Sequence, residues 1–370
     1  MKWVEEFRAP EAIGRLAATI RAGASRRWTV MEICGGQTHT IARYGLDALV
    51  AEAVTLIHGP GCPVCVTPLE VLERARRLAL TDGVVLHTFG DMLRVPGAGG
   101  DLLDARARGG AVSVIHSPLD AVRRAREDAA REHVLFAVGF ETTAPSTAAA
   151  IEHAAALGLT NFAVLASHVR VPPAIEALLS SPDHAIDGLL AAGHVCTVEG
   201  CEDEYPALAA RFGVPIVVTG FEPADLLHGL ERCVARLEAG EAGVENAYAR
   251  AVRPEGNPHA RAAVARVFEV VDRPWRGLGV VAAGGLAIRA RYAAFDAERR
   301  FAGLDPGPLA EPAACKAALV LSGRLSPLDC PELGRGCTPE RPLGAPMVSS
   351  EGACAAYYRF RHTRGSPARA

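Results

Sequence analysis

The sequence predicts an α/β protein made of two Rossmann-like parallel-sheet βαβ domains and a smaller, irregular domain. From about residue 28, short apolar β-branched runs alternate with longer amphipathic runs, which is typical of βαβ units. The short runs are almost continuously apolar, as expected for parallel strands that are covered on both faces. After about residue 240 this alternation weakens, and Gly and Pro become frequent. A chain of 370 residues is also too long for one ordinary core.

The first series of elements begins with a β-branched run, and Pro68 suits the first turn of one of its helices. We expect strands at 29–33, 54–57, 83–89 and 112–115, with helices at 38–50, 68–80 and 118–131. These elements define a first α/β domain at 1–132.

A second series repeats the same alternation. We expect strands at 134–138, 162–165, 186–191 and 214–218, with helices at 143–157, 172–179 and 223–239. These elements define a second α/β domain at 133–240, followed by a C-terminal domain at 241–370 that carries four cysteines.

Composition and charge exclude several classes of function. The net charge is −3 and there is no long Lys/Arg run, so binding to nucleic acid or to a membrane surface has no electrostatic support. The N-terminus lacks a signal-peptide pattern, and the best apolar run, 277–288, is too short to span a bilayer. We therefore expect a cytoplasmic protein. Ten cysteines in that compartment indicate metal binding or catalysis rather than a disulfide framework.

The unusual polar residues directly follow predicted strands. Because ligands of open parallel sheets bind at the carboxyl ends of the strands, these positions predict a cleft between two sheets. The segments concerned are Cys34, the loop from His58 to Cys65, Glu141-Thr142-Thr143, Ser167-His168 and Gly193-His194.

Cys34 lies between a predicted strand and the start of a helix, where the helix N-terminus favours thiolate over thiol. Gly35 and Gly36 clear space beside it for a metal or a small anion. His39, about one helical turn further on, is placed to move protons. The alternative is that Cys34 is a small core residue.

Cys62-Pro63-Val64-Cys65 is a C-x-x-C segment between a strand and a helix, the arrangement found in thiol–disulfide oxidoreductases. We interpret it as a redox pair. Half of a structural zinc site is the main alternative, although no second C-x-x-C accompanies it.

Cys315, Cys330, Cys337 and Cys354 are the right number for a [4Fe–4S] cluster, which takes one thiolate per iron. Their spacing is not that of bacterial ferredoxins, and structural zinc normally has shorter paired spacings. Spacing alone therefore leaves both metals open.

The remaining candidates carry weaker signals. His58, His168 and His194 follow strands, and each is as consistent with a structural hydrogen bond as with a functional role. Glu141 and Glu222 are candidates for acid–base or supporting roles, with Thr142 and Thr143 as helix caps and possible ligand donors. Three further cysteines are not assigned to a site: Cys196, Cys201 and Cys233.

Together, several long segments resemble the HypD family of hydrogenase maturation factors over nearly the whole chain. They include MEICGGQTHT at 31–40, HGPGCPVCVTP at 58–68, GFETTAP at 139–145, GFEP at 220–223 and VSSEGACAAYY at 348–358. The resemblance is incomplete at Pro346, where some members carry cysteine, and at Cys196, where serine is expected.

The resemblance implies a cytoplasmic scaffold for the Fe(CN)2CO group of [NiFe]-hydrogenases. It implies a complex with the small chaperone HypC, and cyanide delivered by HypE after HypF has charged it. Carried onto this sequence, Cys34 is an iron ligand shared with HypC, and Cys62 with Cys65 is a redox pair. The four late cysteines become ligands of a [4Fe–4S] cluster that supplies electrons to that pair.

On this interpretation the protein is a redox-active assembly factor rather than a conventional turnover enzyme. The first alternative is a freestanding thiol–disulfide oxidoreductase that uses the cluster as its electron source, and that model gives Cys34 no role. The second alternative is a passive binding module stabilised by zinc.

Overall fold

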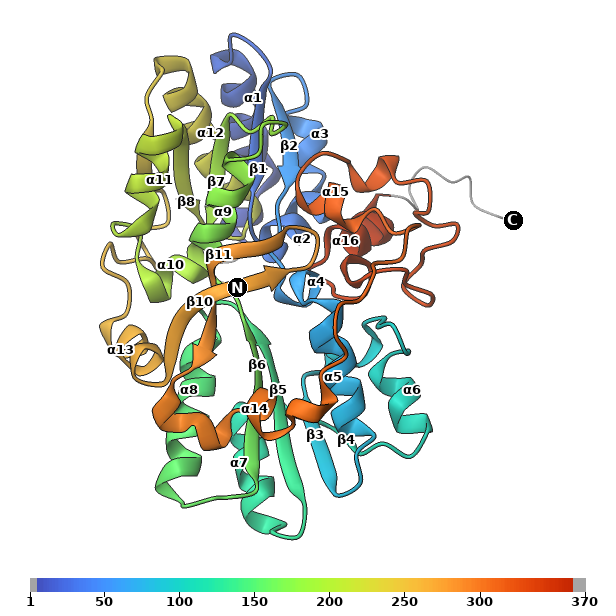
Figure 1. The fold of residues 1–370 in the computed structure, drawn as a ribbon. Coiled ribbons are helices and arrows are strands. Elements are labelled where there is room, and N and C mark those ends of the chain that lie inside the picture. Colours follow the sequence, from blue (N-terminus) through green and yellow to red (C-terminus); the bar gives the residue numbers. More distant parts are fainter. Residues whose placement is uncertain (1–4, 362–370) are drawn as a thin grey trace.

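The computed structural model describes residues 5–361, whose strands form two parallel sheets and one antiparallel hairpin (Figure 1). Sheet A has the strand order β2-β1-β7-β8-β9, and sheet B has the order β4-β3-β5-β6. Sheet A contains β1 (Trp28–Glu32), β2 (Val54–His58), β7 (Gly188–Ala192), β8 (Pro215–Thr219) and β9 (Gly243–Asn246). Sheet B contains β3 (Val84–Thr88), β4 (Val112–Val114), β5 (Glu132–Gly139) and β6 (Phe162–His168). The hairpin pairs β10 (Phe268–Trp275) with β11 (Gly279–Ile288).

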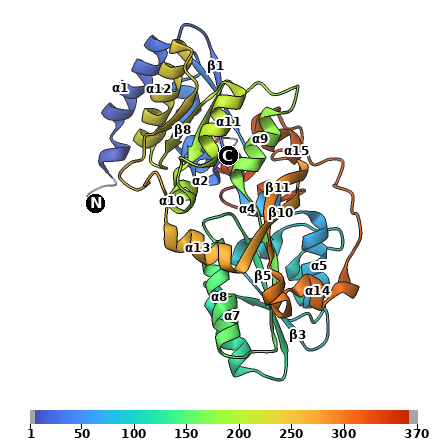
Figure 2. The ribbon, with the colours of Figure 1, turned by 60° about the vertical axis from the view of Figure 1, so that its left-hand side comes forward.

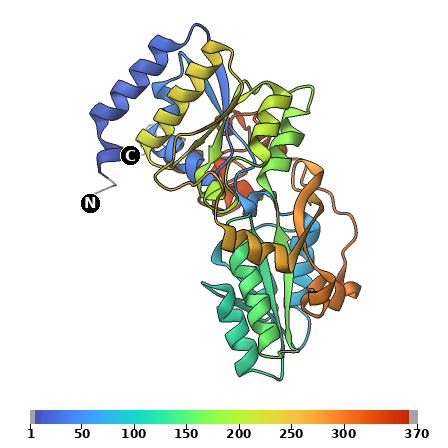
Figure 3. The same ribbon diagram turned by 90° about the vertical axis from the view of Figure 1, so that its left-hand side faces the viewer.

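Helices cover both faces of each parallel sheet, as the apolar strands predicted (Figures 2 and 3). On sheet A, α1 (Pro10–Gly23) and α12 (Pro223–Ala239) pack on one face, and α9 (Val171–Leu179) and α11 (Glu204–Phe212) pack on the other. On sheet B, α7 (Pro118–Glu127) and α8 (Ala144–Ala156) lie opposite α5 (Leu69–Ala79) and α6 (Leu102–Ala107).

The remaining helices are short or belong to the C-terminal part. They are α2 (Gly35–Tyr44), α3 (Leu46–Leu49), α4 (Pro63–Val66), α10 (Gly193–Glu199), α13 (Pro258–Val267), α14 (Ala297–Arg300), α15 (Ala317–Leu321) and α16 (Ala353–Phe360). Single 3-10 turns add to these, among them η1 (Glu6–Arg8) and η6 (Ala345–Met347). No helix within residues 5–361 has both the length and the apolar character needed to cross a membrane.

The predicted α/β class and its strand–helix alternation are confirmed, but the strands sort into sheets in an unexpected way. β1 and β2 pair with β7, whereas β5 pairs with β3. The pairing therefore does not divide the chain at residue 132, as the ranges 1–132 and 133–240 assumed. The alternation of strands and helices predicts that parallel βαβ units exist. It does not predict which sheet each strand joins, because the connection between two strands can carry the chain into another sheet.

The carboxyl ends of the two sheets face each other across the middle of the molecule. Figure 1 shows sheet A above and sheet B below, with α2, α4 and the β10–β11 hairpin between them. α4 packs against β5, and Phe140, at the end of β5, lies 6.0 Å from the Trp275 ring of the hairpin. This arrangement brings the strand-end residues of both sheets into one central region.

Candidate functional site

Cys34 occupies the junction between β1 and α2, as predicted, and it is the N-cap residue of α2. The loop after β2 lies directly against it, and the Gly35 N–H donates to the Gly61 carbonyl at 2.9 Å. A Cβ at Gly61 would stand only 2.3 Å from the Cys34 nitrogen, so this approach requires glycine. The two strand-end loops therefore form one tightly packed unit.

The Cys34 thiol is 4% exposed, and its sulfur lies 3.6 Å from Nδ1 of His194. Burial raises the pKa of this thiol far above its ordinary value, although the N–H groups of Gln37 and Gly36 act in the opposite direction. The helix start was expected to favour the thiolate, but desolvation outweighs it here. A bound cation would reverse this balance, because a metal-bound thiol is deprotonated.

Glu32, the last residue of β1, organises the surroundings of Cys34. Its carboxylate accepts from the Cys34 N–H at 2.8 Å and from the Thr38 hydroxyl, and it lies 2.6 Å from Nδ1 of His58. Glu32 is fully buried, so each of these contacts takes the place of a lost water contact.

A hydrogen-bond chain continues from His58 toward the C-terminal helix. The Tyr357 hydroxyl donates to Asp47 at 3.2 Å, so its oxygen accepts from Nε2 of His58 at 2.8 Å. Glu32, His58, Tyr357 and Asp47 are therefore joined in one hydrogen-bond chain, whose first member lies two residues from Cys34.

His39 lies on α2 as predicted, but its Nδ1 meets the Ser350 carbonyl at 3.1 Å and its ring packs on Phe360. The imidazole in contact with Cys34 is that of His194, at the start of α10. Sequence reasoning did not pair these residues because they meet only through the β1–β7 register, in which Glu32 lies opposite Leu190. Burial lowers the pKa of His194 to about 4, so its ring is neutral.

Cys62 is the N-cap residue of α4 and Cys65 lies within this short helix; both are free thiols, 3% and 0% exposed. Their side chains are hydrogen bonded to each other, and burial together with Cys62 raises the pKa of Cys65. The predicted adjacency of the two sulfurs is therefore present, in a site closed to solvent.

The four late cysteines line one small cavity whose wall is otherwise mainly apolar. Burial raises the pKa of three of these thiols, Cys315, Cys337 and Cys354, and the neighbouring sulfurs raise the pKa further. The Leu343 N–H donates to Cys337 at 3.4 Å, a contact that favours thiolate. Four thiols therefore converge on one cavity, the number that a [4Fe–4S] cluster takes. Within residues 5–361, however, no group of three or more His, Cys, Asp or Glu side chains is placed to hold a metal ion.

The two cysteine sets are neighbours in the fold. α4 packs against η6, and Cys354 is close enough to Cys65 to contribute to its raised pKa. α16 packs on α2, where a Cβ at Gly35 would lie 2.5 Å from the Glu351 backbone oxygen. The C-terminal segment thus seals the Cys34 region on one side.

A second group of predicted residues gathers at the end of sheet B. Glu141 is buried; one carboxyl oxygen accepts from the Val171 N–H at 2.7 Å and the other has no partner among the described residues. Burial raises the pKa of Glu141 to about 8. α10 lies between this group and Cys34, since His194 contacts Cys34 while Cys196, on the same helix, interacts with Glu141.

The other candidates of the two strand-end groups have structural contacts. His168 is buried against Phe268, with Thr147 at 3.3 Å from its Nε2. Thr143 is the N-cap residue of α8, but its hydroxyl donates to the Phe140 carbonyl and forms no cap hydrogen bond; Thr142, half-buried, precedes it. Glu222 caps α12 and pairs with Arg8. Cys201 lies close to Cys196, and both are buried.

The fold and the site together define a class: α/β proteins of two parallel sheets that bury reactive cysteines where their strand ends meet. Comparisons with known proteins identify one family within this class. The HypD family model, described as "Hydrogenase formation hypA family", matches residues 11–361. The chain belongs to the HypD family of hydrogenase maturation factors.

Relatives match over almost their entire length. The hydrogenase expression/formation protein HupD of Azotobacter chroococcum is 48% identical over 98% of each chain. The hydrogenase maturation factor HypD of Rhodobacter capsulatus is 46% identical over 99% of this chain and 100% of its own. HypD of Escherichia coli is 44% identical over 98% of each chain. The resemblance found in the sequence is confirmed.

Proposed function

We propose that this hydrogenase maturation factor is the scaffold on which the Fe(CN)2CO group is assembled, with Cys34 as the iron ligand. The observation that carries the proposal is the Cys34 thiol, buried beside a neutral His194 and fixed through its backbone by Glu32. Thiolate and imidazole are ligands suited to iron, which is here the cargo. We further propose that HypC contributes a second thiolate and that HypE, charged by HypF, donates cyanide.

The buried position of Cys34 also defines what a partner must do. At 4% exposure the sulfur is not reached from the surface while Glu351 and Phe221 stay in place beside Gly35 and Gly36. Binding of HypC therefore requires a local opening of the segment around Glu351. Once the complex closes, water is excluded from the iron and its ligands.

Electrons from the [4Fe–4S] cluster would reduce a Cys62–Cys65 disulfide to the dithiol, a step that takes up two electrons and two protons. The two thiols would form the disulfide again by passing these electrons and protons to the iron–ligand chemistry at Cys34. Their burial argues against a freestanding oxidoreductase, because a protein disulfide cannot reach a sulfur that is 0% or 3% exposed. The nearness of Cys354 to Cys65 supports an electron source on the four-cysteine side.

Cys315, Cys330, Cys337 and Cys354 would hold the [4Fe–4S] cluster, which supplies single electrons when bound. Iron, zinc and sulfide analysis of anaerobically purified protein tests this assignment. About four irons and four sulfides per chain are expected. Stoichiometric zinc without sulfide would contradict it.

The central test uses Cys34→Ala and the control Cys233→Ala, which removes a buried thiol of α12 that packs against Gly188 in β7. Each variant is coexpressed with the partner proteins, and the complex with HypC is isolated and examined by infrared spectroscopy. Cys34→Ala is expected to lose the cyanide and carbon monoxide bands, whereas Cys233→Ala keeps them. A Cys34→Ala complex that still carries cyanide-bearing iron would refute the ligand role.

A further inference from the structure

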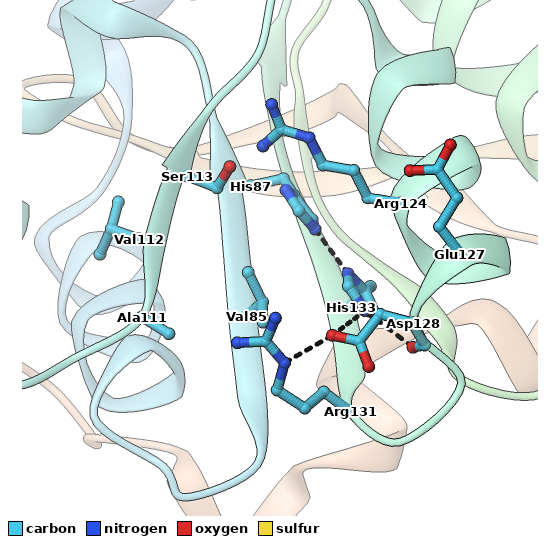
Figure 4. A pocket seen from close by; sticks show the side chains of 10 residues that line it. All are labelled: Val85, His87, Ala111, Val112, Ser113, Arg124, Glu127, Asp128, Arg131 and His133. Carbon is cyan, nitrogen blue, oxygen red and sulfur yellow. Dashed lines mark hydrogen bonds and ion pairs between the residues drawn. The ribbon is translucent and has the colours of Figure 1, made fainter.

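A pocket of about 350 Å³ lies on sheet B, away from the cysteines (Figure 4). Its floor is formed by β3, β4 and the start of β5, and its wall by the last turn of α7 and the loop that follows. Two of the floor residues, His87 and His133, are 1% and 2% exposed. Imidazoles are unusual on a buried sheet face, and the proposed iron chemistry does not use them.

The strand register explains why these side chains meet in an open space. Ser113 is the β4 partner of His87, and Val85 is the β3 partner of His133, so all four project from the same face. α7 packs on that face over β5 through residues such as Ala121 and Val122. It leaves the β3–β4 side uncovered, and the pocket forms there.

The hydrogen bonds fix the tautomers of both rings. Nε2 of His133 lies 3.1 Å from the Asp128 carbonyl, which can only accept, so this nitrogen carries the proton. Burial lowers the pKa of both imidazoles, that of His87 to about 3, so each is neutral. Nδ1 of His133 therefore accepts from Nε2 of His87 at 2.9 Å. The remaining nitrogen, Nδ1 of His87, is an acceptor without a partner among the described residues.

The charge around this free acceptor is positive. Arg124 and Arg131 both act on His87, and Figure 4 shows the Arg124 side chain extending past its ring on the Ser113 side. Arg131 is paired with Asp128 at 2.6 Å, whereas none of the described ion pairs involves Arg124. Glu127 is exposed at the rim and does not contribute to the pKa shift of either imidazole.

We propose that this pocket binds a small oxyanion that carries one proton, of the hydrogenphosphate type. The anionic oxygens pair with Arg124, and the Ser113 hydroxyl adds a hydrogen bond. Because His87 is 1% exposed and its Nδ1 is buried, the ligand reaches that nitrogen only when the Arg124 side chain beside the ring turns outward onto the anion. The acidic O–H of the ligand then donates to Nδ1 of His87. An anion without a proton would instead face the lone pair of that nitrogen. Since a water molecule takes up about 30 Å³, the pocket also accommodates a small organic group on the phosphate.

Binding is tested with the full-length reduced protein by NMR of the histidine ring nitrogens at pH 6. At this pH a phosphate monoester is about half protonated. Before ligand is added, Nε2 of His87 should be the protonated nitrogen. Millimolar inorganic phosphate should shift the Nδ1 resonance of His87, whereas sulfate, which is unprotonated, should bind about tenfold more weakly. Glycerol phosphate binding more tightly than phosphate would identify an ester as the ligand, and the reverse would identify free phosphate.

Two variants on the same helix separate the site from a general charge effect. Arg124→Gln is expected to weaken phosphate binding by about tenfold or more, since a charge-assisted hydrogen bond is lost. Arg123→Gln, which removes an exposed cation paired with Asp120, should bind like the wild type. If Arg124→Gln does not fold, Ser113→Ala should weaken binding about threefold or more. Any one of the following results would overturn the proposal: no response to phosphate, equal binding of sulfate, or a proton on Nδ1 of His87 in the free protein. Unchanged phosphate binding by Arg124→Gln or by Ser113→Ala would overturn it as well.

Discussion

Glu32 determines more of the Cys34 environment than any residue in direct contact with the sulfur. It holds the Cys34 backbone, the Thr38 hydroxyl and the His58 ring at once, from a position with no access to water. A buried acidic side chain at the end of a strand reduces the stability of the fold unless its oxygens are hydrogen bonded. The sequence places Glu32 two residues before Cys34, but it does not reveal the partners in α2 and β2.

Replacing Glu32 separates its hydrogen bonding from its charge. Glu32→Leu should destabilise the protein by about 3 kcal/mol or more, because the Cys34 N–H, the Thr38 hydroxyl and the His58 ring all lose their buried hydrogen-bond partner. Glu32→Gln retains an acceptor for the Cys34 N–H and should recover much of that loss. Urea unfolding measures both, with exposed Glu52→Gln as control. Equal stability of the Leu and Gln variants would contradict this role.

Glu141 predicts a pH dependence of stability. Burial raises its pKa to about 8 from 4.5, so the folded protein binds a proton that the unfolded chain releases between these values. This contribution to stability is complete below pH 4.5 and is lost as the pH rises to about 8.

Thermal unfolding of the wild type and Glu141→Gln across this pH range checks the effect. The advantage of the wild type over the variant should shrink steadily toward pH 8, because glutamine carries no titratable proton. A difference between the two proteins that stays constant with pH would show that Glu141 is ionised in the fold.

At the scale of elements, the sequence predicted best where local pattern and tertiary burial agree. The expected strands of both parallel sheets, and most of the expected helices, formed within a few residues of their ranges, and both cysteine loops follow strands as expected. The helix expected at 38–50 is instead two helices, α2 and α3, divided at Gly45. Strand β9 and the helices α1, α6 and α11 were not predicted. The β10–β11 hairpin was missed because its strands are half exposed and lie in a Gly-rich stretch. The contact of Cys34 with His194 was missed because it depends on which strands pair.

The packing of the β2–α4 loop on the start of α2 gives a test at this scale. Gly61→Ala places a Cβ 2.3 Å from the Cys34 nitrogen and 2.4 Å from its Cα, both backbone atoms that cannot rotate away. We expect a loss of about 1–3 kcal/mol in stability, as for overpacked cores. Gly14→Ala, in α1 with no atom within 4 Å of the added Cβ, should instead stabilise the protein by about 0.5–1 kcal/mol. Equal effects in chemical denaturation would contradict the close approach.

At the scale of the whole molecule, the C-terminal part has less regular secondary structure than the two sheets. Between α15 and α16 it contains only short 3-10 helices, turns, bends and two isolated β-bridges, and its regular hydrogen bonding is sparse. α16 is the exception, since Tyr357 ties it to His58 and Asp47. We therefore expect this part of the chain to be well ordered when metal is bound and less ordered when metal is removed.

Hydrogen exchange with mass spectrometry on metal-loaded and metal-free protein measures this dependence. After iron removal, residues 322–344 should exchange about tenfold faster or more, since a bound metal contributes folding free energy. Strands β5 and β6 should exchange at unchanged rates. Uniform protection across the chain in both states would show that the four-cysteine part is ordered without metal.

The order of strand pairing also has a consequence for how the protein is made. Sheet B is built from one uninterrupted stretch, 84–168, whereas sheet A must wait for β7 to join β1. At ribosomal speeds of 5–20 residues per second, β7 follows β1 by roughly 8 to 30 s. Sheet B can fold first, while β1, β2 and their three cysteines are still without the strand that completes the core around them. On a nascent chain Cys34, the proposed iron ligand, is therefore still exposed, and its surroundings become complete only after His194 has left the ribosome.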